Sequence, residues 1–110
     1  MTMNTFKIKK NDTKPVLATT LQYSDSSAID LNGGSVFFIM GNKDFTPYYS
    51  GLSVITDSTS GQCEYRWDGI NDTGSVGDYW GEFEIKWDSG SIMTLPADHS
   101  LQIKVYEDYN

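Results

Sequence analysis

The chain has 110 residues, which is the size of one domain spanning residues 1–110. Its 15 acidic and 8 basic residues give a formal net charge of −7, which argues against a nucleic-acid partner and against docking on an anionic membrane. Cys63 is the single cysteine, so no intrachain disulfide can form. No apolar run approaches the length needed to span a membrane.

Alternating apolar and polar residues dominate the first half of the chain. Such a period of two is typical of a strand with one face in a core and one in water. In the second predicted strand Leu17, Leu21 and Tyr23 should share one face. The longest apolar run, residues 36–40, has apolar side chains on both faces, as in a strand covered on both sides or an edge strand in a protein contact. The pattern predicts short strands over 5–9, 16–23, 28–31 and 35–40, with turns at 11–15, 24–27 and 32–34.

The second half of the chain begins with the least patterned segment, residues 41–50, which we expect to be a long loop containing aromatic side chains. In the next clear strand Cys63, Tyr65 and Trp67 point inward, which makes Cys63 a buried structural thiol rather than a nucleophile. Residues 68–77 form a second long loop. The pattern predicts strands over 52–56, 62–67, 79–87, 91–95 and 101–105.

The clearest element is the hairpin around residues 88–90. Tyr79, Phe83, Ile85 and Trp87 share one side of an alternating pattern, and the sequence Asp-Ser-Gly that follows can reverse the chain, because Gly90 accepts a positive φ. The segment 77–79 also resembles a tyrosine corner, in which a tyrosine hydroxyl ties a loop to a sandwich. About eight short strands with regular turns and no helical periodicity predict an all-β protein, a sandwich or small barrel.

Candidate catalytic groups are few. His99, the single histidine, follows Asp98, and a solvated turn histidine is the preferred interpretation of that pair. Glu82 and Glu84 lie two residues apart on one strand face, a spacing that resembles a glycosidase pair, but a polar strand face explains it better. We therefore expect a non-enzymatic protein with no catalytic residues.

Metal and cofactor sites are expected to be absent. One histidine and one cysteine are too few for an ordinary structural zinc site. Asp68, Asn71, Asp72 and Asp78 crowd one loop and could offer oxygen ligands to calcium, although capping of turns by these side chains is the preferred interpretation. No glycine-rich loop stands before a helix to hold a phosphate.

Aromatic residues provide the candidate interaction site. Trp80 should point away from Tyr79 and Phe83 if its strand is regular. Aromatic side chains in such positions can anchor a protein interface or stack on a sugar. The predicted interface residues are Phe37, Tyr48, Tyr49 and Trp80.

Several short segments, taken in order, resemble the N-terminal domain of the baseplate upper protein of tailed phages and prophages of Gram-positive bacteria. The resemblance covers residues 5–106, and Asp25, Ser26 and Ser27 stand where the family usually carries Asp-Gly. Its motifs are FKIKKNDTKPVL (6–17), TLQY (20–23), AIDL (28–31), VFFIM (36–40), GQCEYRW (61–67), GDYWGEFEI (77–85) and LP (95–96).

The resemblance implies a single Ig-like antiparallel β-sandwich that serves as a structural module of a phage tail tip. It implies a location in the virion tail after synthesis in the cytoplasm of a bacterial host. The expected partners are other tail or baseplate proteins, with a homo-oligomer also possible, and the family brings no catalytic residues or cofactor. The alternative is a carbohydrate-binding module that uses Trp80 or the loop tyrosines to grip a cell-wall glycan.

Overall fold

The computed structural model describes residues 4–44, 46–96 and 101–107, and this part of the chain is built from strands without a helix. No helix of the described residues could therefore cross a membrane. Nine strands are present in these ranges, where about eight were predicted. They are β1 Asn4–Lys9, β2 Leu17–Thr20, β3 Gly34–Gly41, β4 Pro47–Leu52, β5 Val54–Asp57, β6 Gln62–Tyr65, β7 Gly77–Trp87, β8 Ile92–Leu95 and β9 Leu101–Tyr106.

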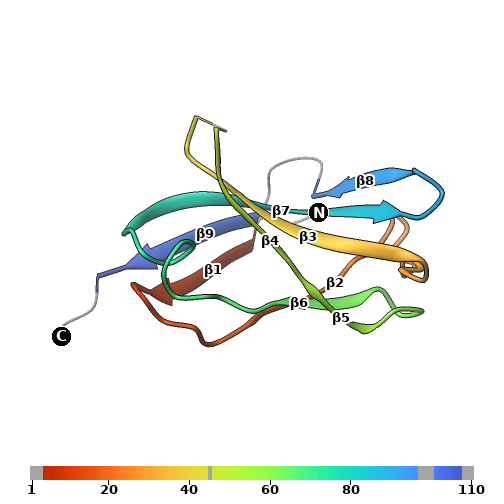
Figure 1. Ribbon diagram of the computed structural model, residues 1–110, viewed down its shortest axis with the longest axis horizontal. Coiled ribbons are helices and arrows are strands. Elements are labelled where there is room, and N and C mark those ends of the chain that lie inside the picture. The colour runs from red at the N-terminus through yellow and green to blue at the C-terminus, as the bar shows by residue number, and fades with distance from the viewer. Residues whose placement is uncertain (1–3, 45, 97–100, 108–110) are drawn as a thin grey trace.

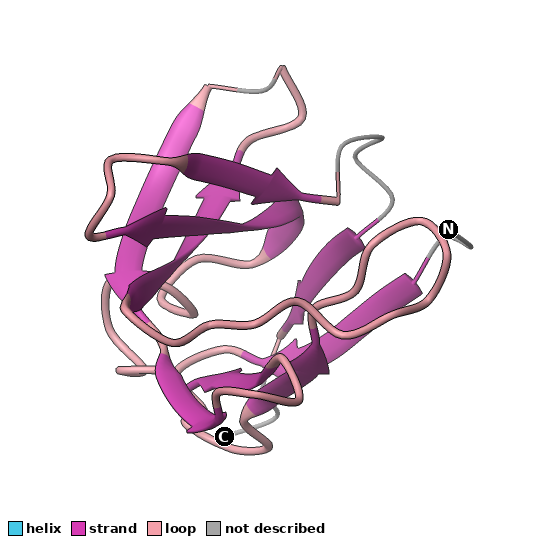
Figure 2. Ribbon diagram, turned by 90° about the vertical axis from the view of Figure 1, so that its right-hand side faces the viewer, coloured by secondary structure: helices cyan, strands magenta, loops and turns pink. Residues whose placement is uncertain are grey.

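The strands form two packed sheets, which confirms the predicted β-sandwich. Sheet A has the order β1-β9-β7-β3-β4, and β8 also pairs with β7. Sheet B has the order β2-β6-β5 and lies along the bottom of the view in Figure 1, and Figure 2 shows the two layers from the side. All pairs are antiparallel except β1 with β9, which are parallel. These two strands come from opposite ends of the chain, so no tight turn dictates their relative direction.

The core lies between the two sheets and is rich in aromatic rings. Phe38, in the central strand β3, is fully buried, and its ring centroid lies 4.7 Å from Tyr65, 5.3 Å from Phe83 and 5.5 Å from Trp67. Tyr65 and Trp67 are buried as predicted, and so is Cys63. Each large ring removed from water stabilises the fold by about 2–3 kcal/mol, which explains how a domain of this size folds without a disulfide.

The hairpin between β7 and β8 has the predicted form. Trp87 N donates to Ser91 O at 3.0 Å, and Gly90 N donates to Trp87 O at 2.9 Å. Gly90 has a φ of 93°, a value that suits glycine. The predicted tyrosine corner is also confirmed, because the Tyr79 hydroxyl donates to the carbonyl oxygen of Ser75 at 2.9 Å.

The prediction of a loop over residues 41–50 was wrong, and the strand predicted over 52–56 begins two residues later, at Val54. The chain forms β4 from Pro47 to Leu52 in sheet A, crosses at Ser53, and enters sheet B as β5. The alternation was hidden because the pairing of β3 with β4 shifts between Met40 and Gly41. Tyr48 and Tyr49 consequently both pack against the core.

The predicted strand over 16–23 is shorter, and the strand over 28–31 does not form. β2 ends at Thr20, yet Leu21 remains buried, because its N–H donates to Gly61 O and its carbonyl accepts from Ile29 N. Tyr23 is 47% exposed and shares no buried face with Leu21. Around residues 28–31 only an isolated bridge pairs Gln22 with Ala28.

The turn after Tyr23 adopts a left-handed conformation without a glycine. Ser26 has a φ of 69°, in a region that glycine enters without strain. Asp25 holds the turn by accepting from Ser27 N at 2.9 Å and from Ser27 Oγ at 2.6 Å. These bonds also lower the pKa of Asp25 below its ordinary value.

Candidate interaction surface

The side of sheet A that points away from sheet B is the candidate interaction surface, here called the outer face. Along β7 every second side chain is buried, from Tyr79 to Ile85, so the intervening side chains point outward. The register of β7 with β3 places the half-buried Phe37 and Ile39 of β3 on the same side. The outward residues of β7 are Asp78, Trp80, Glu82, Glu84 and Lys86.

Apolar side chains cluster on this outer face. Phe37 lies between Glu84 of β7 and Leu52 of β4 in the register of the sheet. Leu52 is 64% exposed. Trp80 is half-buried and, as predicted, lies on the side opposite Tyr79. We call Phe37, Ile39, Leu52 and Trp80 the apolar patch.

Trp80 lies between two hollows. One has a volume of about 400 Å³ and is lined by Trp80 together with Lys43, Asp78, Tyr79 and Gln102. The other has a volume of about 170 Å³ and is lined by Trp80 with Ile39, Gly41, Pro47 and Glu82. The Trp80 side chain therefore lines both hollows beside polar groups, an arrangement in which an aromatic anchor can contact another surface.

Ion pairs border the apolar patch. Lys86 Nζ lies 3.4 Å from Glu84 Oε1 and 5.3 Å from the centroid of the Phe37 ring. Lys43 Nζ lies 3.7 Å from Asp78 Oδ2. Lys43, Asp78 and Lys86 are exposed and Glu84 is half-buried, so these pairs add little to stability and three of the four charges are open to a partner surface. Glu82 and Glu84 both point outward from β7, on the same side as Trp80.

The other two predicted interface residues lie elsewhere. Tyr48 stacks near Tyr79 with ring centroids 4.8 Å apart, and Tyr49 lies 6.5 Å from Tyr65. Both are half-buried and pack against the core. Burial, followed by the neighbouring Tyr48, raises the pKa of Tyr79 to about 12. The structure therefore brings Phe37 and Trp80 together on one face and does not place Tyr48 and Tyr49 beside them.

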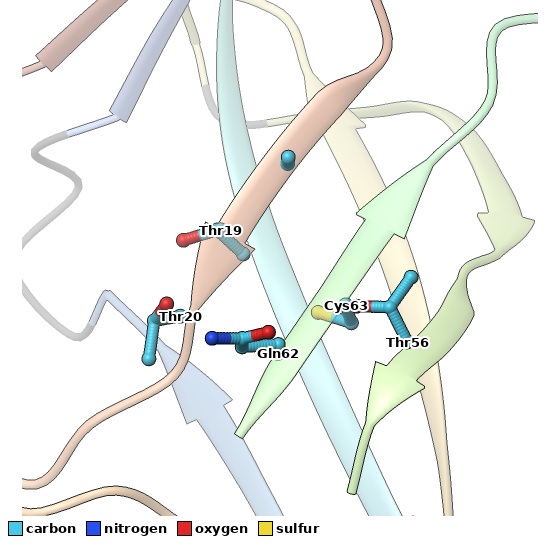
Figure 3. A pocket seen from close by; sticks show the side chains of 6 residues that line it. Thr19, Thr20, Thr56, Gln62 and Cys63 are labelled. Carbon is cyan, nitrogen blue, oxygen red and sulfur yellow. The ribbon is translucent and has the colours of Figure 1, made fainter. Parts of the chain in front are cut away.

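A third hollow, of about 430 Å³, lies on sheet B and is shown in Figure 3. Strands β2, β5 and β6 line it with Ala18, Thr19, Thr20, Thr56, Gln62 and Cys63. Cys63 is only 1% exposed, and burial raises the pKa of its thiol to about 11. A protonated, buried thiol is a poor nucleophile, which agrees with the structural role predicted for Cys63.

In the acidic loop, residues 68–73, aspartate side chains accept hydrogen bonds from the backbone of the loop itself. The buried Asp72 accepts from the Tyr65 hydroxyl at 2.5 Å and from the backbone N–H groups of Asp68, Gly69 and Thr73. Burial acts to raise the pKa of Asp68, but the backbone hydrogen bonds from Ile70 and Asn71 outweigh it and lower that pKa to about 2.

These hydrogen bonds support turn capping over a calcium site. Asp78, the fourth predicted oxygen donor, lies outside that loop. It belongs to β7, and its carboxylate pairs with Lys43. No group of three or more His, Cys, Asp or Glu residues among the described residues could hold a metal ion. His99 and Asp98 lie outside the described residues.

Sequence reasoning missed two members of the apolar patch, Ile39 and Leu52. The signal for Ile39 was present, because the run 36–40 is apolar on both faces of β3. No local pattern predicted that Leu52 points to the outer face, because the direction of its side chain depends on the pairing of β4 with β3, which is a long-range contact.

No protein-family model matches the chain, and no curated protein matches it. Among solved structures, the crystal structure of CopC from Methylosinus trichosporium OB3b is similar, with a TM-score of 0.51 and 10% sequence identity. The match covers 96% of this chain and 87% of that chain. At this identity the likeness concerns the fold alone, and it agrees with the β-sandwich architecture.

Proposed function

We propose that this protein is a non-enzymatic structural component of a phage tail or baseplate, which acts in assembly through protein–protein contacts of its outer face. The observation that carries the proposal is the apolar patch on a sheet whose other side already holds a complete core. Phe37, Ile39 and Trp80 are half-buried and Leu52 is exposed, and apolar side chains that reach the surface on one sheet face are typical of a binding surface. The mixed charges around the patch resemble the polar rim of a protein interface.

The phage location in this proposal is supported by the sequence resemblance over residues 5–106. That family is structural, which fits a surface containing a half-buried tryptophan and phenylalanine rather than converging acids or bases. The partners would be neighbouring tail or baseplate proteins, and the chain would reside in the virion after synthesis in the bacterial host.

A carbohydrate-binding module for adsorption to the host cell wall is the second candidate. It is favoured by the two hollows beside Trp80, because the indole lines one hollow with the polar groups of Asp78 and Gln102 and the other hollow with Glu82. Sugar-binding sites combine aromatic platforms with such hydrogen-bonding groups. Titration of the tryptophan fluorescence with cell-wall polysaccharide separates the two functions, because saturable quenching favours the glycan and no response favours assembly.

The location is tested by gold-conjugated antibody labelling of tailed particles purified from the producing strain. The proposal expects labels at the tail tip, at a copy number that repeats from particle to particle. Labels absent from intact, detergent-washed particles would refute the virion location.

A further inference from the structure

The sequence contains one Asn-Gly pair, Asn32-Gly33, in the loop between β2 and β3. In such a pair the backbone nitrogen of the glycine can attack the side-chain amide of the asparagine, because glycine has no Cβ to hinder the approach. Asn32 and Gly33 are both exposed, and neither belongs to the apolar patch. Chemistry at this pair is therefore independent of the proposed function.

The attacking nitrogen is unengaged in the folded chain. Gly33 N donates to no acceptor among the described residues, although the turn around it is closed by Gly34 N, which donates to Leu31 O at 3.0 Å. A Cβ placed on Gly33 would lie 3.7 Å from Asp88 Oδ2 and meet no other described residue within 4 Å, apart from the chain neighbours of the glycine. The nitrogen can therefore approach Asn32 without first breaking a hydrogen bond.

The amide under attack is contacted at both of its polar atoms. Ser58 Oγ donates to Asn32 Oδ1 at 2.8 Å, and Asn32 Nδ2 donates to Asp30 Oδ1 at 2.8 Å. The Ser58 hydroxyl thus contacts the oxygen on which negative charge develops when Cγ is attacked, as a donor in an oxyanion hole does. Asp30 contacts the nitrogen that leaves.

We infer that Asn32 is a site of spontaneous deamidation, with hydroxide and water as the only co-reactants. Gly33 N gives its proton to hydroxide and forms a bond to Asn32 Cγ, the Cγ–Nδ2 bond breaks, and ammonia leaves with a proton taken from water. Water then opens the cyclic imide, with its hydroxyl going to one of the two ring carbonyl carbons and its proton to the ring nitrogen. Opening at one carbonyl yields aspartate, and opening at the other yields isoaspartate.

The products should weaken the turn. A carboxylate at position 32 would face Asp30 Oδ1, which now accepts from the amide nitrogen, and two carboxylates in contact repel each other. Isoaspartate also adds a methylene to the main chain between Leu31 and Gly34, whose hydrogen bond closes the turn. Deamidation should therefore lower the urea midpoint of the chain.

The acidic loop offers a matched comparison. Asp68→Asn creates a second Asn-Gly pair with Gly69, whose φ of 79° is close to the 72° of Gly33. Gly69 N, however, donates to Asp72 Oδ1 at 3.0 Å. A Cβ placed on Gly69 would lie only 2.9 Å from Asn11 O, so this glycine is enclosed. The same dipeptide is thus open at residues 32–33 and engaged at residues 68–69.

Incubation of the folded whole chain at mildly alkaline pH, followed by peptide mapping with mass spectrometry, tests the inference. We expect Asn32 to convert before the asparagines of the other loops, which are Asn11, Asn42 and Asn71. The more acidic species seen by ion exchange should be missing from Asn32→Gln, because the longer side chain would have to close a larger ring. The separated acidic species should unfold at a lower urea concentration than the unconverted chain.

In folded Asp68→Asn, position 32 should convert at least about tenfold faster than position 68, because Gly69 N must first leave the charged Asp72 carboxylate. In guanidinium chloride, where neither pair is held by the fold, the two positions should convert at similar rates. Circular dichroism checks that the variant folds. If it does not, the comparison of Asn32 with the other loop asparagines in the original chain decides.

Three outcomes would overturn the inference. The first is an Asn32 that keeps its amide in the folded chain while another loop asparagine converts. The second is an equal rate at positions 32 and 68 in the folded variant. The third is an acidic species that still forms in Asn32→Gln at the original rate.

Discussion

The hydrogen bond between Tyr65 and Asp72 should be among the most stabilising single polar contacts in the domain. Both residues are buried, and the hydroxyl donates to the carboxylate at 2.5 Å. Tyr65→Phe keeps the ring packed against Phe38 but removes this bond, so one carboxylate oxygen retains only the Asp68 N–H as a donor. A buried hydrogen bond to a charged group contributes about 1.5–3 kcal/mol, and we expect a loss of about 2 kcal/mol.

Urea denaturation followed by tryptophan fluorescence measures this loss, and a thermal scan should show a fall in Tm of about 10 °C. Tyr106→Phe is the matched control, because Tyr106 is 43% exposed and its change should stay within about 0.5 kcal/mol. Asp72→Asn should cost more, since its amide replaces one of the acceptor oxygens in a site filled with donors. If Tyr65→Phe lowers the free energy of unfolding no more than Tyr106→Phe does, the hydrogen bond from Tyr65 to Asp72 does not stabilise the domain as described.

Three further predictions concern single positions. Ser26→Gly should raise the free energy of unfolding by about 0.5–1 kcal/mol in urea denaturation, because glycine adopts the φ of 69° without strain; a loss of stability would contradict this. The pKa of Asp68, lowered to about 2, means that its contribution is present above about pH 4 and is lost as the pH falls toward 2. Urea midpoints measured across that window should therefore fall less steeply in Asp68→Asn than in the original chain, and equal slopes would contradict the assignment. Cys63 should react with a disulfide reagent at pH 8 at least about a hundredfold more slowly in the native protein than in urea, and comparable rates would show that the thiol is accessible.

Local patterns predicted the elements whose signals lie within a few residues. The hairpin at residues 88–90, the inward side of Cys63, Tyr65 and Trp67, and the Tyr79 corner all follow from alternation and turn chemistry. These features depend on a strand's own sequence, and the structure confirms them.

The features that were mispredicted depend on contacts between distant segments. The shifted pairing between β3 and β4 turns Tyr48 and Tyr49 inward and so hides the strand Pro47–Leu52. For the same reason only two of the four predicted interface residues, Phe37 and Trp80, belong to the apolar patch. Phe37 and Trp80 follow from alternation within their strands, whereas the side on which Leu52 lies is set by the pairing of β4 with β3.

The central claim is that the outer face of sheet A makes the assembly contacts, and incorporation of surface variants into particles tests it most directly. Trp80→Ala removes the central side chain of that face, and Thr20→Ala is the control on sheet B. The quantity measured is the amount of chain that co-purifies with particles, relative to the amount of folded chain in the lysate. We expect Thr20→Ala to enter particles at the original level and Trp80→Ala to remain in the lysate. Equal incorporation of the two variants would contradict it.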